Sequence, residues 1–217
     1  MGVRRLIIYD FFAGTGSATK AFEDRGHKVI KVELQPKFEA DERNVLELQA
    51  AEMIAKYGHP DFIWASPPCT TFSVASCPIY WHYVNGVLTV KDDRVYDGIA
   101  MVKKAISLID EIKPKLGWLI ENPRGMLRKL EFMQELPRRT ITYCQYGDFR
   151  MKPTDLWGIV PGWQARQMCR PGSPCHEQSP RGTTTGNQRL GKQARSMIPY
   201  ALGEEICIQL ERKLNER

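Results

Sequence analysis

The first 34 residues alternate between two hydrophobic patterns on either side of a glycine-rich turn. A short β-branched run at residues 6–9 leads into the turn DFFAGTGS at residues 10–17. A helix-compatible stretch follows and ends at Gly26, and residues 28–34 then alternate apolar and polar side chains as a strand does. A strand, a crossover helix and a second strand within about 30 residues predict a βαβ unit. We therefore expect a parallel sheet with helices packed on it.

The rest of the chain continues the alternation of strands and helices. Strand patterns are predicted at residues 61–65, 116–123 and 138–147, and helical patterns at 39–58, 96–114 and 198–214. A hairpin is predicted at 83–90, with Asn85-Gly86 as its turn. Residues 153–190 lack periodicity and are rich in Pro, Gly, Thr, Cys and Arg. The expected fold class is α/β: a doubly wound, Rossmann-like sheet with a small irregular insert.

Composition narrows the class of protein and partner. The chain of 217 residues fits one domain with a small appendage. It has no run of about 20 apolar residues and no leader-like cleavage site, so we expect an intracellular protein with no membrane partner. The net charge of +6, concentrated after Arg124, suits nucleic acid, although a solvated basic surface would carry the same charge. Six cysteines indicate thiols, catalysis or metal rather than disulfides.

The glycine turn and the end of the second strand together indicate a nucleoside cofactor. Gly14 and Gly16 allow a tight turn and a close approach of the backbone to a ligand. Glu33 closes the second strand, where a carboxylate can accept hydrogen bonds from ribose hydroxyls. The turn lacks the dinucleotide fingerprint and the P-loop lysine. S-adenosylmethionine suits such a turn, although a purely structural α/β turn would give the same pattern.

Two further strands end in side chains that can do chemistry. In DFIWASPPCTTFS, Pro67 and Pro68 end a buried strand and place Cys69 just past its carboxyl end. In WLIENPRGM, Glu121 and Asn122 end another strand, and therefore lie at the same edge of the sheet. A thiolate that adds to C6 of cytosine, with an acid at N3, makes C5 nucleophilic enough to accept a methyl group. A packed cysteine and a paired surface carboxylate are the alternative interpretation.

The ordered motifs DFFAGTGS, Glu33, SPPCTTFS, ENP, YGDFRMKPT and RSMIPYALGEEI resemble the DNA cytosine-5 methyltransferase family, especially its short, phage-type members. They span nearly the whole chain. The resemblance implies a catalytic set of Cys69 as the nucleophile, Glu121 as the N3 acid, Asn122 and Lys152. It also implies an S-adenosylmethionine site lined by Asp10, Phe12, Ala13, Gly14, Thr15, Gly16, Glu33, Asn44, Val45, Pro67 and Ser196. Within that site, Phe12 would flank the adenine and Glu33 would hold the ribose.

The chain departs from the family pattern at several positions. The family's adenine-binding Asp after the third strand is missing, and Asn44 and Val45 are the nearest candidates. Pro123 replaces the usual Val after Glu-Asn, and Lys152 stands where an arginine would contact the target base. About 40 residues replace a larger target-recognition domain. The expected units are a methyltransferase domain at 1–152, a reduced target-recognition region at 153–190 and a C-terminal helix at 191–217 that packs back on the catalytic domain.

Four side chains near the irregular segment have the chemistry of metal ligands. They are Cys144, Cys169, Cys175 and His176. CRPGSPCHE is similar to the metal-binding half of a small zinc knuckle, with Cys144 as the fourth ligand. A metal cross-link would stiffen a segment too small for its own core. The spacing departs from C-x2-C, so a structural zinc and ordinary loop thiols both remain interpretations.

The sequence thus predicts an enzyme, a DNA (cytosine-5-)-methyltransferase that flips its target base out of double-stranded DNA. The segment Val74–Asp93 is expected to close over that base, and basic side chains to contact phosphates: Arg124, Arg128, Arg138, Arg139 and those of 163–195. Methylation of RNA and a catalytically silent nucleic-acid-binding homologue are the alternatives. We expect a cytoplasmic protein, in a bacterial or phage-infected cell, with no obligate protein partner.

Overall fold

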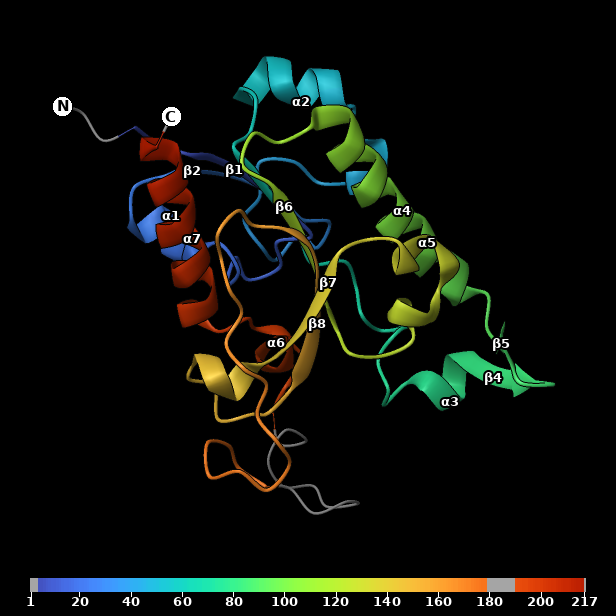
Figure 1. The fold of residues 1–217 in the computed structure, drawn as a ribbon. Helices are drawn as coiled ribbons and strands as arrows, with labels where there is room; N and C mark the ends of the chain where they lie inside the picture. The colour runs from blue at the N-terminus through green and yellow to red at the C-terminus, as the bar shows by residue number, and fades with distance from the viewer. Residues whose placement is uncertain (1–3, 179–189, 217) are drawn as a thin grey trace.

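A six-stranded sheet lies at the centre of the computed structural model, which describes residues 4–178 and 190–216 (Figure 1). Its strand order is β2-β1-β3-β6-β8-β7. The strands are β1 (Ile7–Phe11), β2 (Lys28–Val32), β3 (Phe62–Ala65), β6 (Trp118–Pro123), β7 (Arg138–Thr142) and β8 (Pro153–Ile159). Strands β2, β1, β3 and β6 pair in parallel, whereas β8 runs antiparallel to both of its neighbours. The predicted doubly wound α/β sheet is confirmed.

Helices cover both faces of the sheet (Figure 1). They are α1 (Lys20–Asp24), α2 (Ala50–Tyr57), α3 (Cys77–Tyr80), α4 (Arg94–Ile112), α5 (Glu131–Gln134), α6 (Lys192–Ser196) and α7 (Tyr200–Asn215), with 3-10 turns η1 (Val45–Glu47), η2 (Leu127–Lys129) and η3 (Tyr143–Tyr146). Side chains of α2, α4 and α5 form one buried core with one face of the sheet, and α1 and α7 form a second core on the other face. Within the described ranges, no helix is long and apolar enough to cross a membrane.

A two-stranded hairpin extends away from the body of the protein (Figure 1). It consists of β4 (Trp81–Val84) and β5 (Val87–Val90). Asn85 and Gly86 have φ angles of 50° and 80°, the left-handed pair that a tight hairpin turn of this kind requires. The hairpin predicted from the Asn-Gly pair is therefore confirmed.

The segment predicted to be irregular from residue 153 onward begins as a central strand, so that prediction is wrong for β8. Pro, Asp and Gly are disfavoured in strands, which is why the pattern was missed. Pro153 occupies the first strand position, and Asp155 is fully buried with Arg128 as its partner. Gly158 is needed because a Cβ there would lie 2.1 Å from the carbonyl oxygen of Trp118. The irregular part starts only at Val160, and residues 179–189 of it lie outside the described residues.

Two other boundaries differ from the sequence prediction. The helix expected at 39–58 is confined to η1 and α2, because residues 41–44 instead run beside β2 through a parallel bridge between Val32 and Glu42. The strand expected at 138–147 ends at Thr142, where the chain turns into η3.

Candidate active site

The predicted site residues gather at one edge of the sheet. The parallel strands β1, β2, β3 and β6 end there, and their carboxyl ends lead into the glycine turn, Glu33, the Cys69 turn and Pro123. In an open α/β sheet this edge is where ligands bind, because the loops leave the backbone and side chains free to face a ligand.

The glycine turn is closed against Glu33. Gly14 and Gly16 have φ angles of 52° and 71°, which glycine adopts without strain. The backbone N–H of Gly14 donates to Oε2 of Glu33 at 2.8 Å, and Gln35 N–H donates to Oε1 at 2.8 Å. Ala13 N–H donates to the carbonyl of Val32 at 3.1 Å. Each carboxylate oxygen of Glu33 still has a lone pair that could accept a ribose hydroxyl.

Two residues beside the glycine turn are unusual for a purely structural loop. Phe12 has a φ of 61°, a left-handed conformation that a bulky residue seldom adopts outside functional sites. Asp10 is fully buried; its Oδ2 accepts from the Thr19 hydroxyl at 2.5 Å, but its Oδ1 has no hydrogen-bond partner. Burial raises the pKa of Asp10 to about 7. An orphaned acceptor behind a left-handed turn fits a cationic, donor-rich ligand such as the methionine part of S-adenosylmethionine.

The expected adenine-binding pair has other contacts in the structure. Asn44 caps η1: its Oδ1 accepts from Leu46 N–H at 3.1 Å and its Nδ2 donates to Glu47 at 2.7 Å. The Val45 side chain is buried in the same core against which Phe12 packs. Thus Val45 can offer an apolar wall, whereas Asn44 would have to give up its cap to hydrogen-bond a ligand. Their role toward adenine stays a prediction.

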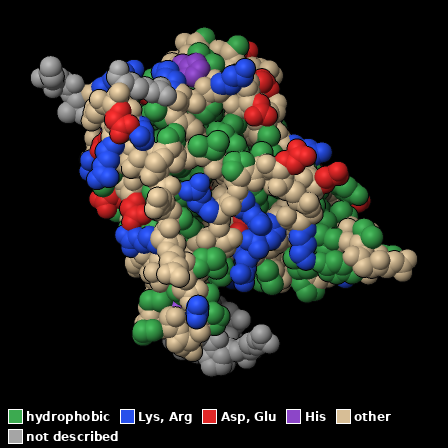
Figure 2. Space-filling model, viewed as in Figure 1, with side chains coloured by type: hydrophobic (Ala, Val, Ile, Leu, Met, Phe, Trp, Pro, Cys, Tyr) green, Lys and Arg blue, Asp and Glu red, His purple; other side chains and the backbone are tan. Residues whose placement is uncertain are grey.

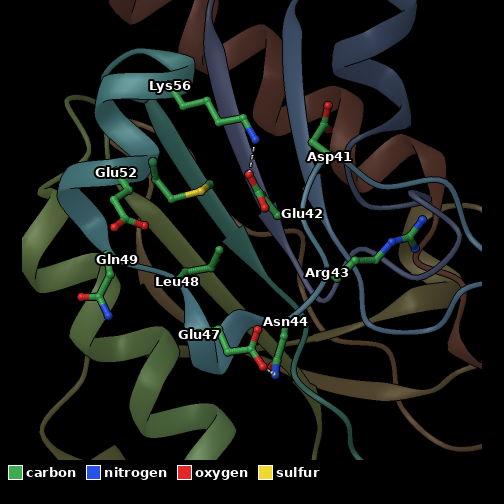
Figure 3. Close-up of a pocket in the computed structure, with 10 residues that line it drawn as sticks. Asp41, Glu42, Arg43, Asn44, Glu47, Leu48, Gln49, Glu52 and Lys56 are labelled. Atoms are coloured by element: carbon green, nitrogen blue, oxygen red, sulfur yellow. Dashed lines mark hydrogen bonds and ion pairs between the residues drawn. The ribbon is translucent and has the colours of Figure 1, made fainter.

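A polar hollow of about 370 Å³ lies beside Asn44 and does not contain the catalytic candidates. It is formed by residues 41–49 and α2, and Lys56 is paired with Glu42 across it (Figure 3). Because neither Cys69 nor Glu121 lines it, this hollow is not the reaction site.

The Cys69 turn is held directly against the end of β6. The Nδ2 of buried Asn122 donates to the carbonyl of Pro67 at 2.9 Å. The Cys69 carbonyl accepts from both Phe72 and Ser73 N–H groups at 3.0 Å, which makes the turn tight. Cys69 itself is only partly buried. The prolines and Asn122 therefore brace the loop that presents the thiol.

Glu121 lies at the centre of an electrostatic network with Cys69 and Lys152. Its side chain is buried, and Oε1 accepts from the Tyr143 hydroxyl at 2.9 Å. Burial raises the pKa of Glu121, against opposing effects of Lys152 and Tyr143. The pKa of Cys69 is also raised, first by burial and then by the charge of Glu121, while Lys152 opposes the shift. The three predicted catalytic side chains thus influence one another's ionisation, although they come from β6 and the segments after β3 and before β8.

Lys152 has a constrained position. Its φ is 27°, its ammonium lies 4.5 Å from the centroid of the Tyr143 ring, and it donates to the carbonyl of Arg195 at 3.1 Å. Burial lowers its pKa, whereas the neighbouring Glu121 and Cys69 favour its charged form. The cation is therefore held between Tyr143 and Arg195, where the charges of Glu121 and Cys69 influence it.

The C-terminal segment returns to this edge, as predicted. The N–H of Ile198 donates to the Ser17 hydroxyl beside the glycine turn at 3.0 Å. Ser196 lies two residues earlier, is exposed, and donates to Gln193 at 2.7 Å within α6. Buried Arg150 holds the segment by donating to the carbonyls of Ala194, Arg195 and Met197 at 3.0 to 3.3 Å.

The predicted phosphate-binding arginines fall into two groups. Arg128 forms a fork with buried Asp155, Arg138 lies 3.9 Å from the same carboxylate, and Arg139 stacks over Trp163. These three have partners within the protein. Arg124, directly after β6, is exposed. Figure 2 shows Lys and Arg side chains gathered in the middle of one face, over β7 and β8.

The four predicted metal ligands also come together. The ligand atoms of Cys144, Cys169, Cys175 and His176 all lie within 4.8 Å of one another. They lie at η3 and in the segment after β8, next to the turn that supplies Tyr143.

Sequence reasoning assigned no role to Tyr143 or Arg150. Tyr143 lies inside the strand predicted at 138–147, so its place just past the end of β7 was not foreseen, and nothing in the sequence pairs it with Glu121. Arg150 stands inside the YGDFRMKPT motif, where its exposure could not be told from the pattern.

The chain is similar in sequence or in fold to known methyltransferases. The chain is 31% identical over 159 residues to the probable DNA (cytosine-5)-methyltransferase of Frog virus 3 (isolate Goorha), covering 72% of each protein. Its fold is similar to that of S. pombe Dnmt2 methyltransferase, with a TM-score of 0.50 and 11% identity over 75% of this chain and 52% of that one. For a Spodoptera frugiperda DNMT2 mutant, the TM-score is 0.44 and the identity 17%, over 74% of this chain and 53% of that one. No protein-family model matches the chain.

The chain therefore spans about half the length of the Dnmt2 structures and most of its viral relative. The sequence relationship, the Rossmann-like sheet and the glycine turn with its facing acid agree on S-adenosylmethionine as the methyl donor. The chain belongs to the cytosine-5 methyltransferase family.

Proposed function

We propose that the protein methylates C5 of cytosine in double-stranded DNA, with Cys69 as the nucleophile and Glu121 as the acid. The observation that carries this proposal is the electrostatic coupling of a partly buried thiol to a buried carboxyl group at the ligand-binding edge of the sheet. S-adenosylmethionine, when bound, supplies the methyl group. Asp10, Phe12, the glycine turn and Glu33 are the residues that would hold it.

The chemistry follows from the protonation states of the two groups. The Cys69 thiolate bonds to C6 while Glu121 gives a proton to N3, so that the electron pair of the C5–C6 bond becomes available at C5. After methyl transfer, C5 loses its proton to solvent, the Cys69–C6 bond breaks, and N3 returns its proton to Glu121. Burial favours the protonated form of Glu121, which suits an acid. Burial and Glu121 raise the pKa of Cys69, and Lys152 opposes that rise, so the cation of Lys152 is the group that would stabilise the thiolate as it attacks.

Asn122 has a positioning role in this proposal. Its amide N–H fixes the loop of the nucleophile through Pro67, while its Oδ1 is buried without a partner. An orphaned acceptor one residue from the acid is suited to accept from the exocyclic amine of cytosine, which would select cytosine over uracil or thymine.

Double-stranded DNA is preferred as the substrate because the viral relative that shares 31% of the sequence is named as a probable DNA methyltransferase. The β4–β5 hairpin, which carries exposed Tyr83, Val84 and Val87, would cover a base flipped out of the duplex. Exposed Arg124 and the basic surface over β7 and β8 would contact phosphates. The part of the predicted recognition region that follows β8, residues 160–190, would read the surrounding sequence. Grouping with phage-type members and a cytoplasmic location stay predictions.

A direct test uses purified protein with methyl-labelled S-adenosylmethionine and two oligonucleotide duplexes of equal sequence, one of DNA and one of RNA. Nucleosides are then analysed by mass spectrometry. We expect methylated deoxycytidine from DNA, and none from the Cys69→Ser variant. Cys77→Ser, a change at another partly buried thiol, is the matched control. Methylation of RNA alone would replace DNA as the substrate; cofactor binding without methyl transfer to either would favour a silent nucleic-acid-binding protein.

A further inference from the structure

The Cys144, Cys169, Cys175 and His176 cluster has the dimensions of a metal site. A tetrahedral zinc with bonds of about 2.3 Å to sulfur and about 2.0 Å to nitrogen separates its ligand atoms by about 3.5 to 3.8 Å. The Cys175–Cys144 sulfurs lie 3.7 Å apart, and His176 Nδ1 lies 3.5 Å from Cys169 and 3.6 Å from Cys175. The Cys144–Cys169 sulfurs, 3.1 Å apart, would separate by a few tenths of an ångström per side chain.

We propose that these four side chains bind one structural Zn²⁺ ion. Three sulfurs and one imidazole nitrogen are soft and borderline ligands, which select zinc over calcium or magnesium. Four protein ligands close the coordination sphere, so no position is left for water or substrate, as in structural rather than catalytic zinc sites. On binding, the three thiols release their protons to solvent and bind as thiolates. A disulfide is a different state, because its sulfurs would be about 2.05 Å apart.

Neighbouring groups hold the ligands in place. Cys169 N–H donates to the Thr142 hydroxyl at 3.0 Å, and Gln145 Nε2 donates to the Cys175 sulfur at 3.5 Å. On either side of the cluster, Arg166 N–H donates to the Tyr146 hydroxyl at 3.0 Å and Glu177 N–H donates to Phe149 at 2.8 Å. The loop therefore contacts η3 and its continuation both before and after the cluster.

A bound metal would stabilise residues 160–178, which bury few apolar side chains. Of residues 160–178, only Val160 and Trp163 are buried, so the loop has almost no apolar core of its own. Zinc binding can supply the folding free energy that such a segment lacks. The ion would fix the loop to η3, whose Tyr143 donates to Glu121. This inference does not rest on the proposed function.

The second cluster of metal-ligand types, His27, Cys207 and Glu211, does not support a site. His27 Nδ1 accepts from Leu6 N–H, and its Nε2 lies 2.9 Å from Glu211. Glu211 is also the partner of Arg25. Both ring nitrogens and the carboxylate are therefore already engaged.

The test measures metal content in the full-length protein, purified under reducing conditions and reconstituted with one equivalent of zinc. We expect one zinc per chain after desalting, and affinity at least about tenfold weaker in Cys169→Ser and in His176→Gln, since even indirect contacts to a metal contribute this much. Cys77→Ser should keep full zinc binding. Replacement by cobalt should give the visible absorption of a tetrahedral ion with thiolate charge-transfer bands, and a chelator should expose residues 160–178 to protease.

Several outcomes would overturn the proposal. They are substoichiometric zinc in the reconstituted wild type, equal zinc affinity in the wild type and both ligand variants, an octahedral cobalt spectrum, and a Cys144–Cys169 disulfide in the freshly reduced protein. His176→Gln keeps all three thiols and changes a half-buried side chain, so it remains informative if Cys169→Ser does not fold.

Discussion

Removal of one hydroxyl group, in a Tyr143→Phe variant, tests whether Glu121 is a tuned acid. The Tyr143 hydroxyl donates to the buried Glu121 carboxyl group at 2.9 Å and lowers its pKa, against the larger effect of burial. A hydrogen bond to a charged group contributes about 1.5–3 kcal/mol. Its loss should therefore raise the pKa of Glu121 further, because the hydrogen bond stabilises the ionised form.

The sign of the effect on stability follows from that shift. The folded-state pKa of Glu121 lies above its unfolded value, so the protonated acid contributes stability at low pH that is lost as the pH rises through the folded pKa. In Tyr143→Phe, ionisation of Glu121 should cost more stability, because the hydrogen bond to the carboxylate is gone. We expect the variant to be less stable than wild type by about 1.5–3 kcal/mol at a pH where both folded proteins carry the ionised carboxylate, and by much less at a pH where both carry the neutral acid.

Urea unfolding at both pH values measures the stability change, and infrared or carbon NMR titration of Glu121 measures its pKa. The pH–rate profile of methylation should fall on its alkaline side where Glu121 loses its proton, and this fall should move to higher pH in the variant. Tyr146→Phe is the matched control, because the Tyr146 hydroxyl accepts from Arg166 and is not bonded to Glu121. A pH-independent loss of stability with an unchanged Glu121 pKa would refute the reasoning.

Four other outcomes are expected. Glu33→Ala should weaken S-adenosylmethionine binding by about 1–3 kcal/mol in calorimetry; unchanged affinity in a folded variant would remove Glu33 from the site. The pKa of Asp10 is raised to about 7, so S-adenosylmethionine binding should release a proton if the ammonium group of the ligand pairs with Asp10. The affinity for S-adenosylmethionine should then increase from about pH 6 to about pH 8, and a flat profile would contradict this pairing. In Gly125→Ala, the new Cβ would lie 2.0 Å from the Phe72 carbonyl oxygen and displace the Cys69 turn, so kcat should fall about 100-fold. Gly191→Ala is the control, because its Cβ would enter open space and leave kcat unchanged. Equal kcat values in the two variants would refute the role of this close approach. The small recognition region should read about two to four base pairs, with binding that weakens steeply in salt; bisulfite sequencing that finds longer defined sites would refute this.

The parallel half of the main sheet and the antiparallel hairpin could be predicted because their signals are local. The turn after β1 needs glycine, β3 ends at prolines, and the hairpin turn needs Asn85-Gly86. Strand β8 could not, because its place in the sheet depends on partners distant in sequence: the Arg128 fork that satisfies Asp155, and the close approach of Gly158 to Trp118.

In the candidate site, too, local signals could be predicted from the sequence, whereas contacts between distant residues could not. Strand ends predicted that Cys69, Glu121 and Glu33 would share one edge, because the topology of a parallel sheet brings such positions together. The contacts of Tyr143 and Arg150 depend on how η3 and the C-terminal segment pack, and no short-range pattern encodes that. The metal ligands were identified by residue type alone, and only the fold shows that their atoms converge.

The central claim, that Cys69 attacks cytosine, is tested most directly by trapping the covalent intermediate. Duplex DNA that contains 5-fluorocytosine cannot lose the group at C5 after methyl transfer, so the enzyme should remain bonded to C6. Digestion and mass spectrometry should locate the adduct on Cys69 in the wild type and in Cys77→Ser, and should find none in Cys69→Ser. An adduct on another residue, or methylation that persists in Cys69→Ser, would contradict the account.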